Sequence, residues 1–140
     1  MTKISVSTDL DVSADQVWQL VGNFNALPDW HPEVEKSELT KKGQERRLSL
    51  VGGGTIVERL EKIDDKARTY SYSIVDSPLP IRNYKATIKV TGKGAGGKGG
   101  CKVEWSSEFE ASTGFENDVL KDLQGMYQSG FDNLKKVFGG

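Results

Sequence analysis

The 140-residue sequence contains one cysteine, one histidine and four prolines, and it has no long apolar run. A single cysteine, Cys101, excludes an intramolecular disulfide and a cysteine-based metal cluster, and a single histidine, His31, excludes a histidine-rich metal site. No stretch approaches the roughly 20 apolar residues that a membrane-spanning helix requires. We therefore expect no metal, no other cofactor and no stable insertion into a membrane.

The charge has no strong sign either, because 19 basic residues oppose 20 acidic ones and give a formal net charge of −1. Proteins that bind nucleic acid usually present a basic surface, so we expect no nucleic-acid partner. Residues 1–5 lack the apolar run of a signal peptide, and a free thiol fits a reducing compartment. These features predict a cytoplasmic protein, which we expect to be a monomer or a weak homodimer.

What the sequence does contain is a series of segments in which apolar and polar residues alternate. The clearest is 102–110, where Val103, Trp105 and Phe109 share one side of the chain. A period of two predicts antiparallel strands that are covered on one face only. The seven strands expected on this basis are 3–10, 34–40, 46–51, 55–63, 68–75, 82–91 and 102–110. The glycine- and lysine-rich stretch 92–100 leads into a strand, not a helix, so we interpret it as an exposed hairpin loop and not as a phosphate-binding loop.

Helical signals lie after the first strand and at the end of the sequence. Residues 13–16 form a capping box, in which the Ser13 hydroxyl accepts the Gln16 N–H and the glutamine side chain reaches back. A second short helix or turn is expected at 25–30. A long helix is expected at 115–138, with a second capping box from Thr113 to Glu116 at its start. Its buried stripe is predicted to be Phe115, Val119, Leu123, Met126, Tyr127, Gly130, Leu134 and Phe138.

This order of one strand, two short helices, several antiparallel strands and a long C-terminal helix resembles the helix-grip fold over essentially the whole chain. The fold is shared by START-like lipid carriers, polyketide cyclase/dehydrase-like proteins and plant pathogenesis-related proteins, all of the SRPBCC superfamily. Segments 15–18 and 25–30 are similar to the opening of many bacterial members. The resemblance implies one α+β START-like domain, 1–140, whose curved antiparallel sheet of about seven strands wraps around the long helix and leaves a ligand-binding cavity.

One stretch resembles the plant abscisic-acid receptors: Thr-Ile-Val-Glu-Arg-Leu-Glu-Lys-Ile-Asp-Asp at 55–65, followed by Asn-Tyr-Lys at 83–85. In those receptors the loop before the first segment is the ligand gate, and the loop before Asn-Tyr-Lys is the latch. The resemblance therefore implies a gate at Gly52, Gly53 and Gly54, and a latch at 76–82 that includes Ser77, Pro78, Leu79 and Pro80. The triple glycine replaces the longer gate sequence of the receptors, and the latch has no His-Arg-Leu.

Glu58 is a candidate site residue because it lies between Ile56 and Leu60 in an expected strand, and the resemblance places it in the cavity. If those two neighbours face the core, the carboxylate points inward, where it must be paired or hydrogen-bonded, or its pKa rises. The opposite phase of the strand would bury Val57 and Ile63 and leave Glu58 as an exposed strand glutamate. The sequence alone allows both.

Arg46 is the expected partner of an inward Glu58, because it shares one strand face with Leu48 and Leu50. Such a buried pair would either orient a polar ligand or serve as an internal salt bridge. Four aromatic residues with polar atoms, Tyr70, Tyr72, Tyr84 and Trp105, fall on inward faces. Unpartnered phenols are costly to bury, so some of them are expected to face a wet or ligand-filled space. The other expected ligand contacts are Ile81, Met126 and Gly130, with Ala86 and Ser107 as small residues that leave volume.

Two functions fit these residues. The first is a carrier or sensor that binds a small hydrophobic or amphipathic molecule, such as a lipid, a polyketide or an aromatic metabolite, in an internal cavity. The alternative is a polyketide cyclase/dehydratase-type enzyme that uses Glu58 and a cavity tyrosine as acid and base. His31 is a second catalytic candidate, although in the sequence Trp30-His31-Pro32 a capping or solvated histidine is the simpler interpretation. An interaction domain with a filled core is a third possibility.

Overall fold

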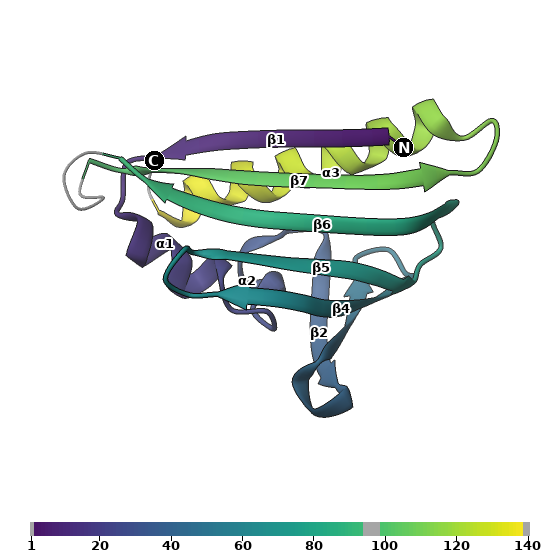
Figure 1. Ribbon diagram of the computed structural model, residues 1–140, viewed down its shortest axis with the longest axis horizontal. Helices are drawn as coiled ribbons and strands as arrows, with labels where there is room; N and C mark the ends of the chain where they lie inside the picture. Colours follow the sequence, from purple (N-terminus) through teal and green to yellow (C-terminus); the bar gives the residue numbers. More distant parts are fainter. Residues whose placement is uncertain (1, 94–98, 139–140) are drawn as a thin grey trace.

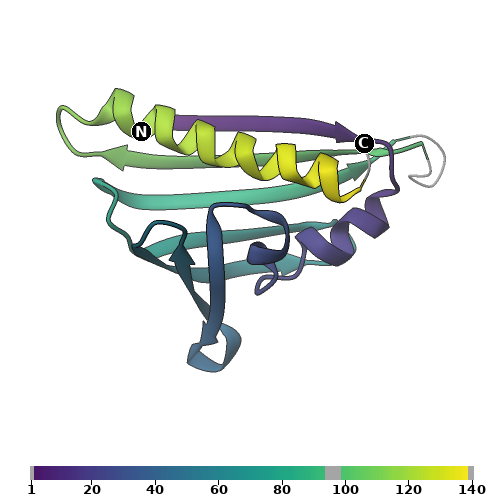
Figure 2. The same cartoon turned by 180° about the vertical axis from the view of Figure 1, so that it is seen from behind.

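Alternating side chains form the two faces of one curved antiparallel sheet, and a long helix lies across its inner face (Figures 1 and 2). A computed structural model describes residues 2–93 and 99–138. The elements are β1 (Thr2–Leu10), α1 (Ala14–Val21), α2 (Leu27–Trp30), β2 (Val34–Thr40), the 3₁₀ turn η1 (Lys41–Gly43), β3 (Glu45–Leu50), β4 (Thr55–Asp64), β5 (Thr69–Asp76), β6 (Ile81–Gly92), β7 (Cys101–Ala111) and α3 (Glu116–Val137). This is the predicted α+β helix-grip fold.

The seven strands lie in the order β1-β7-β6-β5-β4-β3-β2, and every neighbouring pair is antiparallel. Strand β7 shows why the sheet forms, because Val103, Trp105, Ser107 and Phe109 are buried while the residues that alternate with them are partly exposed. Opposite Trp105, β1 places Val6 and β6 places Ile88. Each predicted strand is confirmed with bounds that agree within one residue.

Beside α1, which contacts β6, and α2, which contacts β2, helix α3 lies across β1 and β7 (Figure 2). Its buried face consists of Val119, Leu123, Tyr127, Gly130, Phe131 and Leu134. Because these residues recur every three or four positions, one side of the helix seals the inner face of the sheet. No helix among the described residues is long and apolar enough to cross a membrane.

The start of α3 differs from the prediction. The N-cap residue is Phe115, and no side chain caps the helix, so the expected capping box from Thr113 is wrong. Gly114 has a φ of +89° and helps to form a turn, in which the Phe115 N–H donates to the Ser112 carbonyl. This turn delays the first helical residue and leaves the Phe115 side chain 48% exposed, outside the buried stripe where we expected it.

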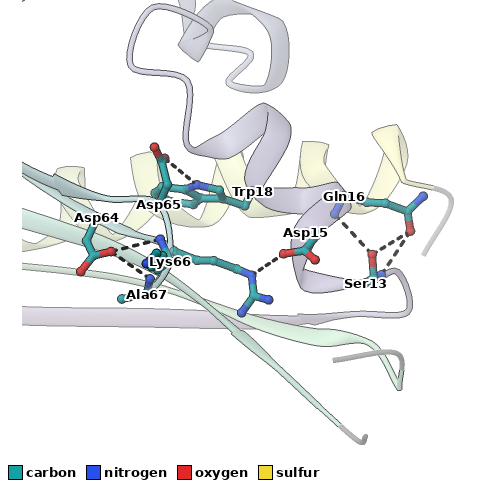
Figure 3. A network of polar contacts seen from close by, with 9 residues as sticks. Ser13, Asp15, Gln16, Trp18, Asp64, Asp65, Lys66 and Ala67 are labelled. Carbon is teal, nitrogen blue, oxygen red and sulfur yellow. Dashed lines mark hydrogen bonds and ion pairs between the residues drawn. The ribbon is translucent and has the colours of Figure 1, made fainter. Parts of the chain in front are cut away.

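Helix α1 begins as predicted. The Ser13 Oγ accepts the Gln16 N–H at 3.3 Å, and the Ser13 N–H donates to Gln16 Oε1 at 3.4 Å, as Figure 3 shows. The second short helix is confined to Leu27–Trp30, with Pro28 in its first turn. Most of the predicted loop 92–100 falls on residues 94–98, outside the described residues.

Two polar contacts attach α1 to the turn between β4 and β5 (Figure 3). The Trp18 indole N–H donates to Asp65 Oδ1 at 3.0 Å, and Arg68 Nε donates to Asp15 Oδ1 at 2.8 Å. The turn itself is held by Asp64, whose Oδ1 accepts two backbone N–H groups of the next residues. These contacts fix α1 to one end of the sheet, and α2, which follows it, lies over the interior.

Candidate functional site

The inner faces of β3 to β7 meet α2 and α3 around a narrow internal cavity. Its lining is mostly apolar but includes one carboxylate, three phenols and one imidazole. The lining residues are Leu27, His31, Val34, Leu48, Leu50, Ile56, Glu58, Tyr72, Ile74, Leu79, Tyr84, Trp105, Leu123, Met126 and Tyr127. The volume open to the centre of a water molecule is about 20 Å³, and one bound water needs about 10–15 Å³ on this measure.

This cavity is far smaller than the ligand-sized space that the resemblance implied. Tyr127 fills the centre: its ring stacks on Trp105 with centroids 4.3 Å apart and planes 16° apart. Its hydroxyl donates to Ser107 Oγ at 2.8 Å, so the volume expected beside this small residue is occupied. In this conformation the cavity has room for about one water, and a larger guest requires side chains or a helix to move.

Arg46 and Glu58 lie opposite each other on β3 and β4 and form a buried ion pair. Arg46 Nε and Nη2 lie 2.8 and 2.6 Å from the same oxygen, Glu58 Oε1. Nη1 donates to the Phe24 carbonyl at 2.5 Å, and the guanidinium carbon lies 4.1 Å from the Phe24 ring centroid. The sequence left the direction of Glu58 open. The structure has the carboxylate facing inward and paired with Arg46, the expected partner of an inward Glu58.

Only one member of the ion pair lines the cavity. Glu58 lines it, whereas Arg46 does not, and the arginine side chain is only 1% exposed. Burial raises the pKa of Glu58 above its ordinary value, and the charge of Arg46 acts in the opposite direction. Removal from water favours the neutral form of a carboxyl group, and a nearby cation favours the ionised form. A buried acid in a cavity with a perturbed pKa is a frequent property of functional sites.

Hydroxyl groups connect the strands to α3. The hydroxyls of Tyr84 and Tyr127 are hydrogen-bonded to each other, and the Tyr127 hydroxyl donates to Ser107 Oγ. The Trp105 indole N–H donates to the Tyr72 hydroxyl at 2.9 Å. Burial raises the pKa of Tyr127 to about 12 and the pKa values of Tyr72 and Tyr84 well above 10. These three phenols are thus neutral and hydrogen-bonded, and they line the cavity, as we expected of some of the inward aromatic residues.

His31 is the C-cap residue of α2 and is buried between α2 and α3, so its interpretation as a capping residue is confirmed and the solvated alternative is wrong. One ring nitrogen, Nε2, lies 2.8 Å from the Met126 carbonyl, and the other, Nδ1, accepts the Glu33 N–H at 3.1 Å. A carbonyl only accepts and an amide N–H only donates, so these partners select the neutral ring with its proton on Nε2. Both nitrogens are engaged by backbone groups, which leaves neither free for proton transfer to a ligand.

The candidate residues predicted from sequence separate into two groups. Those that line the cavity are Leu48, Leu50, Glu58, Tyr72, Tyr84, Trp105 and Met126, together with His31 and, from the latch loop, Leu79. Those that do not are Arg46, Tyr70, Ile81, Gly130, Gly52, Gly53, Gly54, Ser77, Pro78 and Pro80. Arg46 and Gly130 instead support lining residues, since Arg46 holds Glu58 and Gly130 packs against His31.

Six lining residues were not among the candidates: Leu27, Val34, Ile56, Ile74, Leu123 and Tyr127. The alternation of the strands and the helix stripe already placed most of them on inward faces. Tyr127 is the most informative omission, because its phenol reaches across to Ser107 on β7. Its position on the buried stripe of α3, as that helix's only tyrosine, was the available signal.

The two loops of the receptor resemblance flank the site at one end of the sheet. Gly52, Gly53 and Gly54 all have a positive φ, between +88° and +105°, which only glycine adopts without strain. Residues 77–80 join β5 to β6, and Leu79 from this loop reaches the cavity. The latch loop thus touches the cavity directly, and the glycine loop only adjoins its wall at Leu50.

A larger hollow, of about 660 Å³, lies on the outer face of the sheet and is open to solvent. Ser5, Ser71, Thr87 and Ser106 form a hydroxyl band across four strands there. Charged side chains, among them Lys62, Lys85 and Glu108, also line this hollow, so it lacks the apolar enclosure of a small-molecule site. Within 2–93 and 99–138, no group of three or more His, Cys, Asp or Glu residues could hold a metal ion.

Comparison with known proteins agrees with this architecture. Residues 1–139 match the model of the family described as polyketide cyclase / dehydrase and lipid transport. The solved structure of XoxI from Bacillus cereus is 38% identical, with 99% of this chain and 96% of that chain covered and a TM-score of 0.93. A protein from Bacillus thuringiensis is 37% identical over 99% of this chain and all of that chain, also with a TM-score of 0.93.

More distant structures share the fold. Norcoclaurine synthase from Thalictrum flavum, solved with dopamine and hydroxybenzaldehyde, is 22% identical, with 97% of this chain and 85% of that chain covered and a TM-score of 0.74. None of the curated proteins is a significant match to the sequence. The chain is a START-like protein of the SRPBCC superfamily, and it belongs to the polyketide cyclase/dehydrase and lipid transport family.

Proposed function

We propose that this protein binds one small apolar or amphipathic molecule between the sheet and α3, as a carrier or a sensor. The observation that carries the proposal is the convergence of one carboxylate, three phenols and one imidazole on a mostly apolar interior. Few polar groups in an apolar enclosure are typical of small-molecule sites. The family description, which joins polyketide cyclases and lipid transport, supports the same class of ligand.

Binding goes with an expansion of the cavity, because the closed interior has room for about one water. Met126 and Leu79 are the lining residues best suited to move. Met126 is half-buried, and its unbranched side chain adapts to guests of different shape. Leu79 lies on the latch loop, between β5 and β6 and outside the strand ladder. Loop movement that admits and encloses a ligand is a common gating device in binding proteins and enzymes.

Mass spectrometry of the protein purified from its native host tests the proposal, with the bound molecules extracted and identified. Leu79→Trp should reduce the bound fraction several-fold, since the indole would occupy the entrance. Val75→Trp is the matched control, because Val75 is exposed near the same end of the sheet and does not line the cavity. An intact mass equal to that of the bare chain, with no shift of lining-residue amides on adding apolar probes, would reject the function.

A second candidate function is an enzyme of the cyclase/dehydratase type. The observation in its favour is that Glu58 both lines the cavity and has a raised pKa, beside the phenol of Tyr72. Structures with the same fold include norcoclaurine synthase and a di-domain aromatase/cyclase. Loss of turnover in Glu58→Gln, with binding retained, would favour this candidate. His31 is not a candidate acid or base in this enzyme, because backbone groups occupy both of its ring nitrogens.

A further inference from the structure

Glu58 presents only one of its two carboxylate oxygens to Arg46. Both close contacts of the guanidinium go to Oε1. In the part of the chain that the structure describes, Oε2 accepts no hydrogen bond. The residue is 5% exposed and lines the cavity. Among the described residues, the fully buried side-chain atoms without a hydrogen-bond partner are Trp30 Nε1 and Arg46 Nη2, and not Oε2. Oε2 is therefore accessible at the cavity, and an acceptor in an apolar enclosure favours a guest that supplies a donor.

The positive charge of Arg46 is not available to the same guest. Nε and Nη2 face Glu58, and Nη1 donates to the Phe24 carbonyl. Aromatic rings surround the guanidinium, with its central carbon 4.1 Å from the Phe24 centroid and 5.2 Å from the Tyr72 centroid. Because Arg46 does not line the cavity, an anionic guest would meet the carboxylate before it met the cation.

The neighbouring phenols differ in what they can offer. The Tyr72 hydroxyl accepts the Trp105 N–H, so its own proton remains available to donate. The hydroxyls of Tyr84, Tyr127 and Ser107 form a chain in which Tyr127 donates to Ser107 and Tyr84 therefore donates to Tyr127, so both of these phenol protons are already engaged. A guest that donates to Glu58 Oε2 and accepts the Tyr72 hydroxyl proton would form a hydrogen bond with each of these two groups.

We propose, on the basis of the function proposed above, that the polar group of the ligand is an uncharged or cationic hydrogen-bond donor, a hydroxyl or an amine, and that carboxylates are excluded. A second carboxylate beside Glu58 would place two negative charges together in a medium of low dielectric constant, where repulsion is strong. Glu58 is then the specificity-determining residue, and Arg46 is a positioning residue that holds it.

Probes that differ only in the head group test this on the unmodified protein. Benzyl alcohol, benzylamine and benzoate form one matched set, and octanol, octylamine and octanoate form a longer one. Affinities come from amide shifts of lining residues at pH 7 and fixed ionic strength. In each set the alcohol or the amine should bind at least tenfold more tightly than the carboxylate. Equal or tighter binding of the carboxylate overturns the inference but leaves the proposed function standing. Failure of all six probes to bind would reject both.

Paired substitutions identify the source of the discrimination. Glu58→Gln alone leaves Arg46 buried without a counter-ion, so the variant Arg46→Gln/Glu58→Gln, in which both side chains are neutral, is preferable. Its preference for donors over carboxylates should fall below about threefold. The matched control is Glu45→Gln/Arg59→Gln, an ion pair of 3.0 Å on the same two strands but on the opposite face. The control should keep the full preference. An unchanged preference in the Arg46→Gln/Glu58→Gln variant would overturn the assignment to Glu58.

Discussion

His31 packs directly against the backbone of Gly130. A methyl group added at this glycine would lie 2.8 Å from His31 Cδ2 and 3.0 Å from the Trp30 ring. The same imidazole lies 2.8 Å from the carbonyl of Met126, one helical turn earlier on α3. The contact therefore joins α2 to the middle of the long helix, on one wall of the candidate site.

The first prediction concerns the two interior glycines of α3. Gly130→Ala should destabilise the protein by about 1–3 kcal/mol, since the methyl group overpacks the contact with His31 and Trp30. Gly125→Ala should instead stabilise it by about 0.4–1 kcal/mol, since that position faces open space and alanine favours the helix. Urea unfolding of both variants measures the two effects. If the substitutions shift the midpoint in the same direction, the close approach of His31 to α3 is wrong.

The second prediction is a pH dependence that arises from His31. Burial lowers the pKa of His31 below its ordinary value of 6.5. The hydrogen bond to the Met126 carbonyl and the nearby Glu33 partly oppose the shift, and Arg46 adds to it. The unfolded chain then binds more protons than the folded one below about pH 6.5. The stabilising contribution is complete above that pH and is lost as the pH falls towards the folded pKa, with a slope of at most about 1.4 kcal/mol per pH unit.

Unfolding free energies between pH 5 and 7, measured for the protein and for His31→Gln, isolate this contribution. Carboxyl groups titrate in both proteins, so only the difference between the two curves reports on His31. We expect that difference to shrink as the pH falls. A difference that is constant over the range would mean that His31 has the same pKa in the folded and the unfolded chain.

The sequence predicted the sheet well because the alternation of apolar and polar residues in each strand reflects which face of that strand is buried. Strand β7 alternates buried and partly exposed residues along its length, and a period of two predicts a sheet that is covered on one face. The same logic left Glu58 undecided, since the two phases of β4 bury comparable apolar residues. The inward phase of β4 is the one that pairs Glu58 with Arg46 on the neighbouring strand. This pairing depends on the tertiary structure, and the alternation of residues within one strand does not contain it.

The size of the cavity could not be predicted in this way. It depends on whether the ring of Tyr127 turns towards Trp105, and a rotation of that ring changes the volume without changing the pattern of the helix. The prediction of a capping box at the start of α3 was wrong for a local reason. Thr113 and Glu116 have the spacing of a capping box, but the positive φ of Gly114 places a turn between them.

The third prediction concerns the stability of the buried ion pair. Arg46→Met leaves the carboxylate of Glu58 buried without its partner, and it should cost about 3–5 kcal/mol. The double variant Arg46→Met/Glu58→Leu removes both charges and should recover most of that loss. Guanidinium chloride unfolding of the two single variants and the double variant gives the coupling between the residues. Additive effects would show that the two side chains do not interact across β3 and β4.

The fourth prediction uses the tyrosines as reporters of the closed interior. The chain has four tyrosines, and all of them are buried with pKa values that burial raises above 10. The folded protein should therefore show almost no phenolate absorbance at pH 10.5, whereas the urea-unfolded chain should show it for all four residues. Because the folded pKa values are raised, the tyrosines favour the folded state below pH 10, and this contribution is lost as the pH rises further.

Alkaline titration followed by ultraviolet absorbance and by circular dichroism distinguishes ionisation from unfolding. We expect phenolate to appear in one cooperative step, together with the loss of the folded signal. The variant Tyr127→Phe is the informative comparison, because it breaks the hydroxyl chain between Tyr84 and Ser107 and leaves both without their shared partner. It should lower the pH of that step. A gradual titration near pH 10 with the fold intact would mean that the phenols contact solvent, and that the interior opens far more readily than its packing implies.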